Sequence, residues 1–183
     1  MLWTNKMDDY PANLAPEFEE GGAVKTPFDE WWAQAQPSFP NVPVDVARQW
    51  LHRHWKHSPY SYLISKNYRF DQRQWADLKT ILTRWSDFKA ENAGALEKGE
   101  ELVNLKPDWM PYVPKYMLEH SKFPAPIIVL DNQDGHHDKE YPKQHDLPSA
   151  YVLVEGHTRF NVGIYLQSAG KLNQADVWLM TRV

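Results

Sequence analysis

The feature that most constrains the fold is a strand that passes directly into a helix through a glycine. Residues 151–154 read Tyr-Val-Leu-Val, a pattern typical of a strand buried on both faces. Glu155-Gly156 follows, and residues 158–169 have a helical pattern that Gly170 ends at the C′ position. This unit predicts a sheet domain that carries helices.

The rest of the second half supplies further strands. Residues 126–130, which read Pro-Ile-Ile-Val-Leu, and residues 177–180 are predicted to be buried strands. The apolar run at 102–105 is taken as a first short strand, and 113–120 as a helix. The order strand, helix, strand, strand, helix, strand indicates an α/β or α+β domain over residues 99–183, with a small mixed sheet.

The first half has a different character. Residues 1–25 contain prolines and glycines without sustained periodicity, which predicts an irregular arm. Residues 26–98 are predicted to form a helical, aromatic-rich subdomain. Its first helix is expected to start at Thr26, as a capping residue, with Pro27 at the first helical position. A second helix is predicted over residues 44–54.

A longer helix is predicted to start at Asp71, because apolar residues then recur at the three-and-four spacing of a buried stripe. Residues 60–64 are interpreted as a short strand or an extended connector. Residues 89–99 are charged and contain two glycines, which indicates a frayed helix end or linker and a subdomain boundary near Gly99. The stripe consists of Trp75, Leu78, Ile81, Leu82 and Trp85.

Composition excludes several classes of protein. The 183 residues suffice for one domain, or for one small domain with a helical appendage, and 42% hydrophobic with 24% charged residues is typical of a folded protein. A net charge of −4 argues against a protein that coats nucleic acid or anionic membrane. No apolar run is long enough to span a membrane and the N-terminus is acidic, so we expect a cytoplasmic protein.

Two residue types are unusual in number. Cysteine is absent, which excludes disulfides, thiolate metal sites and a cysteine nucleophile. Nine Trp and nine Tyr indicate an aromatic core or rings at a partner surface. The pair Trp31-Trp32 is expected to pack between subdomains, and an exposed patch for a protein partner is the alternative.

The turn after residue 154 carries the chemistry. Backbone N–H groups at the start of a helix favour an anion, Gly156 allows a sharp turn, and Arg159 offers a fork that fits phosphate oxygens. Thr158 is expected to cap the helix or donate its hydroxyl, and His157 adds a donor or acid near neutral pH. Glu155 would repel phosphate unless it binds a ribose hydroxyl, a metal ion or Arg159. The alternative is an ordinary helix start with a capping threonine and a solvated arginine.

At these residues the sequence resembles the ParB/sulfiredoxin superfamily. The matching pieces are residues 126–129, residues 152–159, and the helix that ends at Gly170, and the resemblance covers roughly the last 80 residues. In that superfamily the turn holds nucleotide phosphates: CTP in partition proteins, ATP in sulfiredoxins. His157 replaces the sulfiredoxin cysteine, which argues against sulfinic-acid repair, and Thr158 brings the turn nearer to the free-serine kinases.

The resemblance implies an enzyme that hydrolyses ATP or another nucleoside triphosphate, or transfers its phosphoryl group, with Mg²⁺. Gly156, His157, Thr158 and Arg159 would bind the nucleotide. Asp108 matches the position of the general base in the kinase-like members, although the usual His-Glu pair is absent. The sequence around Asp108 also allows a second interpretation, in which Asp108 is only a turn residue after Pro107. The implied catalytic residues are Asp108, Glu155 and His157.

A non-catalytic function is the alternative. Members of the same superfamily act in plasmid partition and fertility inhibition, and some are nucleases, which implies a module that binds a protein or DNA partner. This chain lacks the second arginine of the partition proteins' turn, which argues against chromosome-style partitioning. The helix end at residues 52–57, His-Arg-His-Trp-Lys-His, could contact nucleic-acid phosphates or a protein. The alternative is an ordinary basic helix end with its Trp turned inward.

The polar loop at residues 132–149 holds residue types that bind divalent metals. Adjacent histidines cannot easily share one metal, and the spacing matches no ligand pattern. We therefore expect no dedicated metal site but a solvated, mobile loop that covers the nucleotide, with an Mg²⁺ or Zn²⁺ site as the alternative. The residues concerned are Asp131, Asp134, His136, His137, Asp138, His145 and Asp146.

Overall fold

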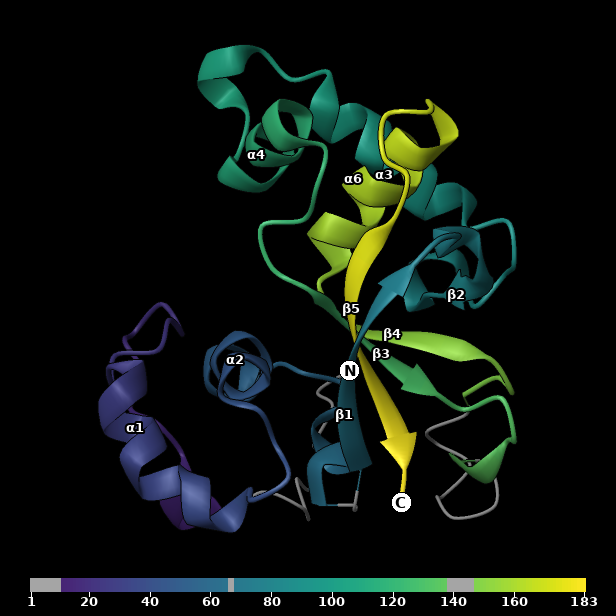
Figure 1. Cartoon of the computed structure of the whole chain (residues 1–183). Helices are drawn as coiled ribbons and strands as arrows, with labels where there is room; N and C mark the ends of the chain where they lie inside the picture. Colours follow the sequence, from purple (N-terminus) through teal and green to yellow (C-terminus); the bar gives the residue numbers. More distant parts are fainter. Residues whose placement is uncertain (1–10, 66–67, 138–146) are drawn as a thin grey trace. The chain divides into compact units, whose positions relative to one another are not determined.

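The computed structural model describes residues 11–65, 68–137 and 147–183, which form a mixed α/β structure (Figure 1). The chain divides into two compact units. Unit 1 comprises Met1–Phe70 with Arg182–Val183, and unit 2 comprises Asp71–Thr181. Gly99, near which the sequence predicts a subdomain boundary, lies inside the helix α3 (Ala93–Val103).

Unit 1 is helical and has an aromatic core. The helix α1 (Phe28–Ala35) follows Pro27, and α2 (Val44–Val46) continues into the π-helix η3 (Ala47–His52), as the sequence predicts for residues 44–54. Trp31 packs inside this unit, edge-on to Trp55 with ring centres 5.8 Å apart. The short 3-10 helices η1 and η2 cover Ala12–Leu14 and Gln36–Ser38.

Two local predictions for unit 1 are wrong. Thr26 does not cap α1, because its hydroxyl accepts a hydrogen bond from the Glu17 amide at 2.8 Å, and Pro27 takes the N-cap position. Residues 60–64 are neither a strand nor an extended connector, since η4 (Ser61–Ser65) is a 3-10 helix. Three residues per turn place Tyr60 and Leu63 on one side, and both are fully buried.

Unit 2 is built on a mixed sheet. Its strands lie in the order β1-β5-β3-β4-β2, and β3 runs parallel to β5 but antiparallel to β4. The sequence predicts β3, β4 and β5 because each contains the apolar and β-branched residues of a buried strand. The strands are β1 (Tyr68–Trp75), β2 (Ile81–Leu82), β3 (Ile127–Asp131), β4 (Tyr151–Glu155) and β5 (Ala175–Arg182).

Three helices pack together in unit 2 (Figure 1). They are α3, α4 (Tyr112–His120) and α6 (His157–Ser168), and both α4 and α6 agree with the predicted helices. Ile127 and Val129 of β3 belong to the same buried cluster as Phe160 of α6, so α6 covers that face of the sheet. Gly170, with φ +67°, ends the last helix as predicted.

The prediction of a helix that starts at Asp71 is wrong. This segment instead forms β1, then the 3-10 helix η5 (Leu78–Thr80), β2, and the 3-10 helix η6 (Arg84–Ser86). Leu78 and Ile81 do reach the core, since both are fully buried, whereas Trp85 is 64% exposed. A spacing of three residues fits a 3-10 turn as well as an α-helix, and this ambiguity caused the error.

Two further predictions in the second half are wrong. Residues 89–99 do not form a frayed helix end or a linker. The helix α3 begins at Ala93 and includes both of their glycines. Residues 102–105 are not a first strand, since α3 continues to Val103. Leu102 and Val103 are partly buried against the unit 2 core, so these apolar residues complete a helix face.

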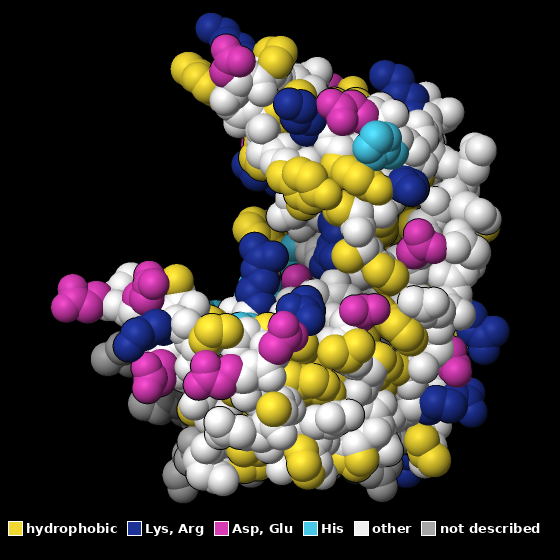
Figure 2. All heavy atoms as spheres, turned by 60° about the vertical axis from the view of Figure 1, so that its left-hand side comes forward, with side chains coloured by type: hydrophobic (Ala, Val, Ile, Leu, Met, Phe, Trp, Pro, Cys, Tyr) yellow, Lys and Arg dark blue, Asp and Glu magenta, His cyan; other side chains and the backbone are white. Residues whose placement is uncertain are grey.

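Hydrophobic side chains also reach the surface among charged ones (Figure 2). Among the described residues, the most exposed large rings are Trp109, at 71%, and Tyr112, at 68%, both next to the start of α4. No helix within the described ranges has the length and apolar composition needed to cross a bilayer.

Candidate functional site

Gly156 forms the turn between β4 and α6 in a conformation that favours glycine. Its backbone has φ +100° and ψ 30°, in the left-handed region. A Cβ atom here would lie 2.6 Å from Cγ2 of Ile127, closer than any ordinary contact. The sharp turn that the sequence predicts therefore requires a glycine at this position.

The helix start does not use the threonine as a cap. Gly156 takes the N-cap position, and its carbonyl accepts the first helical hydrogen bond from the Phe160 amide at 2.8 Å. Thr158 lies two residues beyond Gly156 and is exposed, so the prediction that it caps α6 is wrong. The first N–H groups of any helix point out of its end, and here the exposed hydroxyl of Thr158 lies beside them.

Arg159 folds back over this turn instead of extending into solvent. The residue is 9% exposed, and its Nη1 donates to the carbonyl oxygen of Ala125 at 3.3 Å. Its Nη2 lies 3.7 Å from Oε1 of Glu155. The alternative of a solvated arginine is therefore wrong. Because Glu155 balances the guanidinium charge, a bound phosphate would compete with this carboxylate for Arg159.

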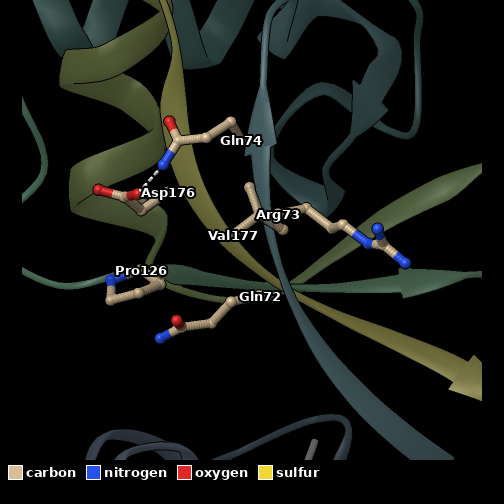
Figure 3. A pocket seen from close by; sticks show the side chains of 6 residues that line it. All are labelled: Gln72, Arg73, Gln74, Pro126, Asp176 and Val177. Carbon is tan, nitrogen blue, oxygen red and sulfur yellow. Dashed lines mark hydrogen bonds between the residues drawn. The ribbon is translucent and has the colours of Figure 1, made fainter.

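A pocket of about 350 Å³ lies beside the same strand ends of the sheet as the turn (Figure 3). Glu155 at the end of β4 pairs with Ile128, and Ile127 at the start of β3 pairs with Val177 near the start of β5. These pairings place the start of α6 and the pocket at the same end of these strands. The pocket is lined by Gln72, Arg73, Gln74, Pro126, Asp176 and Val177.

Sequence reasoning missed these pocket residues. Gln72 and Gln74 are two residues apart, which places both on one side of a strand, whereas the apolar spacing of this segment predicts a helix. Asp176 precedes the predicted strand at 177–180 and meets Gln74 through a hydrogen bond from Nε2 to Oδ1. The polar alternation Gln-x-Gln was the signal that could have identified an edge strand.

Asp108 is not brought to the turn by any contact that the structure describes. It lies in the 3-10 helix η7 (Pro107–Trp109), between α3 and α4, and is exposed. Within the described part of the chain it makes no hydrogen bond or ion pair with the turn residues. This location agrees with the alternative of a turn residue after Pro107. The carboxylate that the structure places beside the turn is Glu155.

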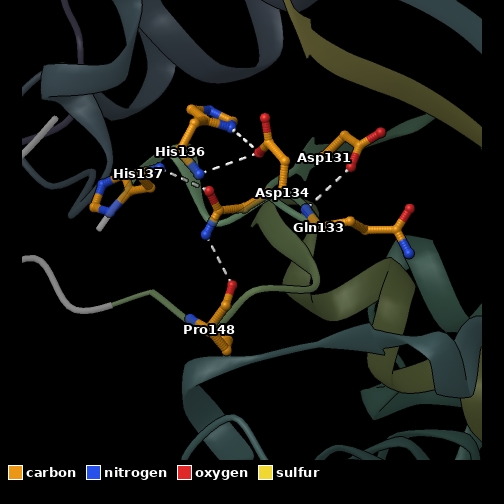
Figure 4. A network of polar contacts seen from close by, with 7 residues as sticks. Asp131, Gln133, Asp134, His136, His137 and Pro148 are labelled. Atoms are coloured by element: carbon orange, nitrogen blue, oxygen red, sulfur yellow. Dashed lines mark hydrogen bonds and ion pairs between the residues drawn. The ribbon is translucent and has the colours of Figure 1, made fainter. Parts of the chain in front are cut away.

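The loop after β3 is partly buried. His136 and His137 are 2% and 1% exposed, so the expectation of a solvated loop is wrong for these two residues. Nδ1 of His136 lies 2.6 Å from Oδ1 of Asp134, and the His137 amide donates to Oδ1 of Asn132 at 2.9 Å (Figure 4). No cluster of three metal-ligating side chains occurs among the described residues. Asp138, His145 and Asp146 lie outside them.

The basic helix end in unit 1 has its Trp turned inward, as one of the two interpretations held. Trp55 is 2% exposed, and Nε2 of His52 lies 2.8 Å from the carbonyl oxygen of Thr26. Lys56 lies over the ring of Phe18, with Nζ 3.7 Å from its centre. Part of the cluster is thus occupied by contacts within unit 1.

Comparison with known proteins gives no match. This holds for family models, for curated proteins and for solved structures.

Proposed function

We propose that unit 2 binds a nucleoside triphosphate together with Mg²⁺, with the phosphates at the Gly156 turn. The observation that carries the proposal is a left-handed glycine that opens α6 directly from a buried strand, with a buried arginine folded onto it. Such a helix start offers N–H groups and a positive dipole end to an anion. The pocket of about 350 Å³ at the same sheet edge offers room for the remainder of the ligand.

Each side chain of the turn has a role in this proposal. Arg159 offers a planar fork to phosphate oxygens once they compete with Glu155. Thr158 is exposed in the first turn and can donate its hydroxyl. His157 is half-buried beside it, and its ring nitrogens can donate or accept a hydrogen bond or exchange a proton.

Mg²⁺ fits the donor set in a limited way. The described residues hold no group of three ligating side chains, so the phosphates themselves would supply most of the oxygen ligands. Glu155 can add one carboxylate oxygen, because it lies directly before the turn. When bound, the ion neutralises charge on the phosphates. With that charge screened, the turn can support hydrolysis or phosphoryl transfer, which mainly need positioning and one proton acceptor.

The test is a thermal-shift series with ATP, ADP, CTP and GTP, each with Mg²⁺. A ligand that binds the folded state alone raises its stability, so at least one nucleotide should raise the melting temperature. Arg159→Ala should abolish the rise, but this side chain is buried and its loss could impair folding. Thr158→Glu is the sharper variant, because Thr158 is exposed and a carboxylate there favours the helix dipole but repels phosphate.

The matched control for this variant is Ala93→Glu. Ala93 is exposed at the first position of α3, so the same charge enters another helix start in the same unit. The control should keep the nucleotide response that Thr158→Glu loses. Release of inorganic phosphate, measured for the wild type and for Glu155→Gln and His157→Ala, tests hydrolysis separately. A wild type that no nucleotide stabilises, or a Thr158→Glu variant that still responds, overturns the proposal and favours the protein- or DNA-binding module.

A further inference from the structure

The pocket at the sheet edge has a chemical character different from that of the turn. Gln72 and Gln74 extend from β1 on one side, toward Pro126 and Asp176, whereas Arg73 extends to the other side (Figure 3). Nε2 of Gln74 donates to Oδ1 of Asp176. The amide of Gln72 is exposed and makes no hydrogen bond with any described residue, so a ligand can use both its donor and its acceptor.

The charge of the pocket excludes phosphate from it. Asp176 contributes a carboxylate, which accepts hydrogen bonds and repels anions. Arg73 does not cancel this charge, because its Nη2 lies 3.8 Å from Asp71 and its side chain points away from Asp176 (Figure 3). The group that fits here is therefore neutral or cationic and carries N–H donors beside an acceptor.

The distance across the sheet suits the two ends of a nucleotide. The start of α6 follows β4, and the pocket lies between β3, β5 and β1, which are successive strands. Strands are spaced by about 4.8 Å, so the three steps from β4 to β1 span roughly 14 Å. An extended nucleoside triphosphate has a similar reach from its terminal phosphate to its base. Pro126 and Val177 add apolar surface against which a flat ring can pack.

From this arrangement we infer that the pocket binds the nucleobase and selects bases that carry an exocyclic amino group. This inference rests on the proposed function and specifies its ligand. The second carboxylate oxygen of Asp176 accepts a hydrogen bond from the amino group. The side-chain amide of Gln72 donates to the neighbouring ring nitrogen. A base with a carbonyl in place of the amino group would direct its oxygen at the carboxylate and lose this contact.

The experiment compares two pairs of ligands that differ in that group. ATP is compared with ITP, and CTP with UTP, by direct titration with Mg²⁺. We expect the amino-bearing member to bind about tenfold more tightly, because one hydrogen bond to a charged group in a partly exposed pocket is at stake. Inorganic tripolyphosphate is titrated in parallel as a probe of the turn alone, since it has no base.

Variants locate the preference in the pocket. Asp176→Asn should reduce the preference to less than about threefold, because the amide can donate to a carbonyl as readily as it accepts from an amino group. Glu119→Gln, which removes one exposed carboxylate from α4, should retain the full preference. Since Asp176 also holds Gln74, Gln72→Ala serves as a second variant that breaks no described contact, and it should weaken nucleotides but not tripolyphosphate.

The outcomes separate this inference from the proposed function. Equal binding within both pairs, with tripolyphosphate still bound, overturns base selection by the pocket and leaves the phosphate site. A preference for amino bases without any binding of tripolyphosphate supports the pocket and overturns the turn as the phosphate site. Absence of binding for every ligand overturns both.

Discussion

Replacing Gly99 with alanine should separate α3 from α6 and destabilise unit 2. A Cβ atom at Gly99 would lie 1.9 Å from the carbonyl oxygen of Asn161 and 3.0 Å from Cβ of Tyr165. Favourable contacts between heavy atoms lie at about 3.5–4.0 Å, so the helices would have to move apart by more than 1 Å. The obstructing oxygen belongs to the α6 backbone, so no rotation of a side chain can remove the clash.

The magnitude follows from two opposing effects. Overpacking of this kind costs about 1–3 kcal/mol and occasionally more, while alanine in place of glycine stabilises a helix by about 1 kcal/mol. Since the contact at Gly99 is far below the ordinary limit, we expect a net loss of about 2 kcal/mol in the free energy of unfolding. For a chain of this size the melting temperature should fall by about 4–8 °C, measured by circular dichroism.

Gly163→Ala in α6 is the matched control. Its Cβ would lie 2.7 Å from ring atoms of Phe123 and 2.9 Å from Cδ1 of Leu78, which are side-chain atoms that can shift. This variant should therefore lose less stability than Gly99→Ala. If Gly99 were a linker glycine, alanine would instead stabilise the protein by about 0.4–1 kcal/mol. A Gly99→Ala variant as stable as the wild type would refute the helix packing described above.

Three further predictions concern charge, pH and exposure. Without Mg²⁺, Glu155→Gln should tighten tripolyphosphate binding about tenfold, because the carboxylate that pairs with Arg159 and repels phosphate is removed; weaker binding in a titration would contradict this. Burial and the Asp131 carboxylate raise the pKa of Tyr151, so its protonated form stabilises the fold below about pH 10 and this contribution is lost as the pH rises further. Tyr151→Phe should flatten the fall in urea midpoint above about pH 10, and an unchanged slope would count against the assignment. Trp109→Ala should change the unfolding free energy by less than about 0.5 kcal/mol, because the ring is 71% exposed and its contact with Nζ of Lys106, 5.3 Å from the ring centre, is at the surface; a larger loss in urea denaturation would contradict this.

The sequence predicts β3, β4, β5 and α6 because their signals are local and agree with one another. Each strand is a short apolar run, and glycines stand at both ends of α6. The segment before α3 gave the opposite result. β1 is mostly polar, so it lacks the hydrophobic alternation of a strand, while Leu78 and Ile81 reach the core through a 3-10 turn.

The candidate site was accessible from the sequence in part. Gly156 and the first turn of α6 follow from a strand-to-helix pattern, and the structure shows the left-handed backbone there. The hydrogen bond from Arg159 to the carbonyl oxygen of Ala125 depends on the position of β3, which lies far away in the sequence. The pocket depends on the strand order that places β1 next to β5, and no local pattern encodes that order. The nucleotide function itself stays a prediction.

The hydrogen bonds of Asn132, which is fully buried after β3, indicate where a label can be inserted into the protein. Its backbone amide and side-chain Nδ2 donate to the carbonyl oxygens of Ala150 and Pro148, while its own oxygens accept from the amides of Gly135 and His137. The residue therefore fastens the two ends of the intervening segment together at their base. Since the entropy of closing a loop grows slowly with its length, a peptide tag or fluorophore inserted between these fastened ends should leave the strands on either side paired.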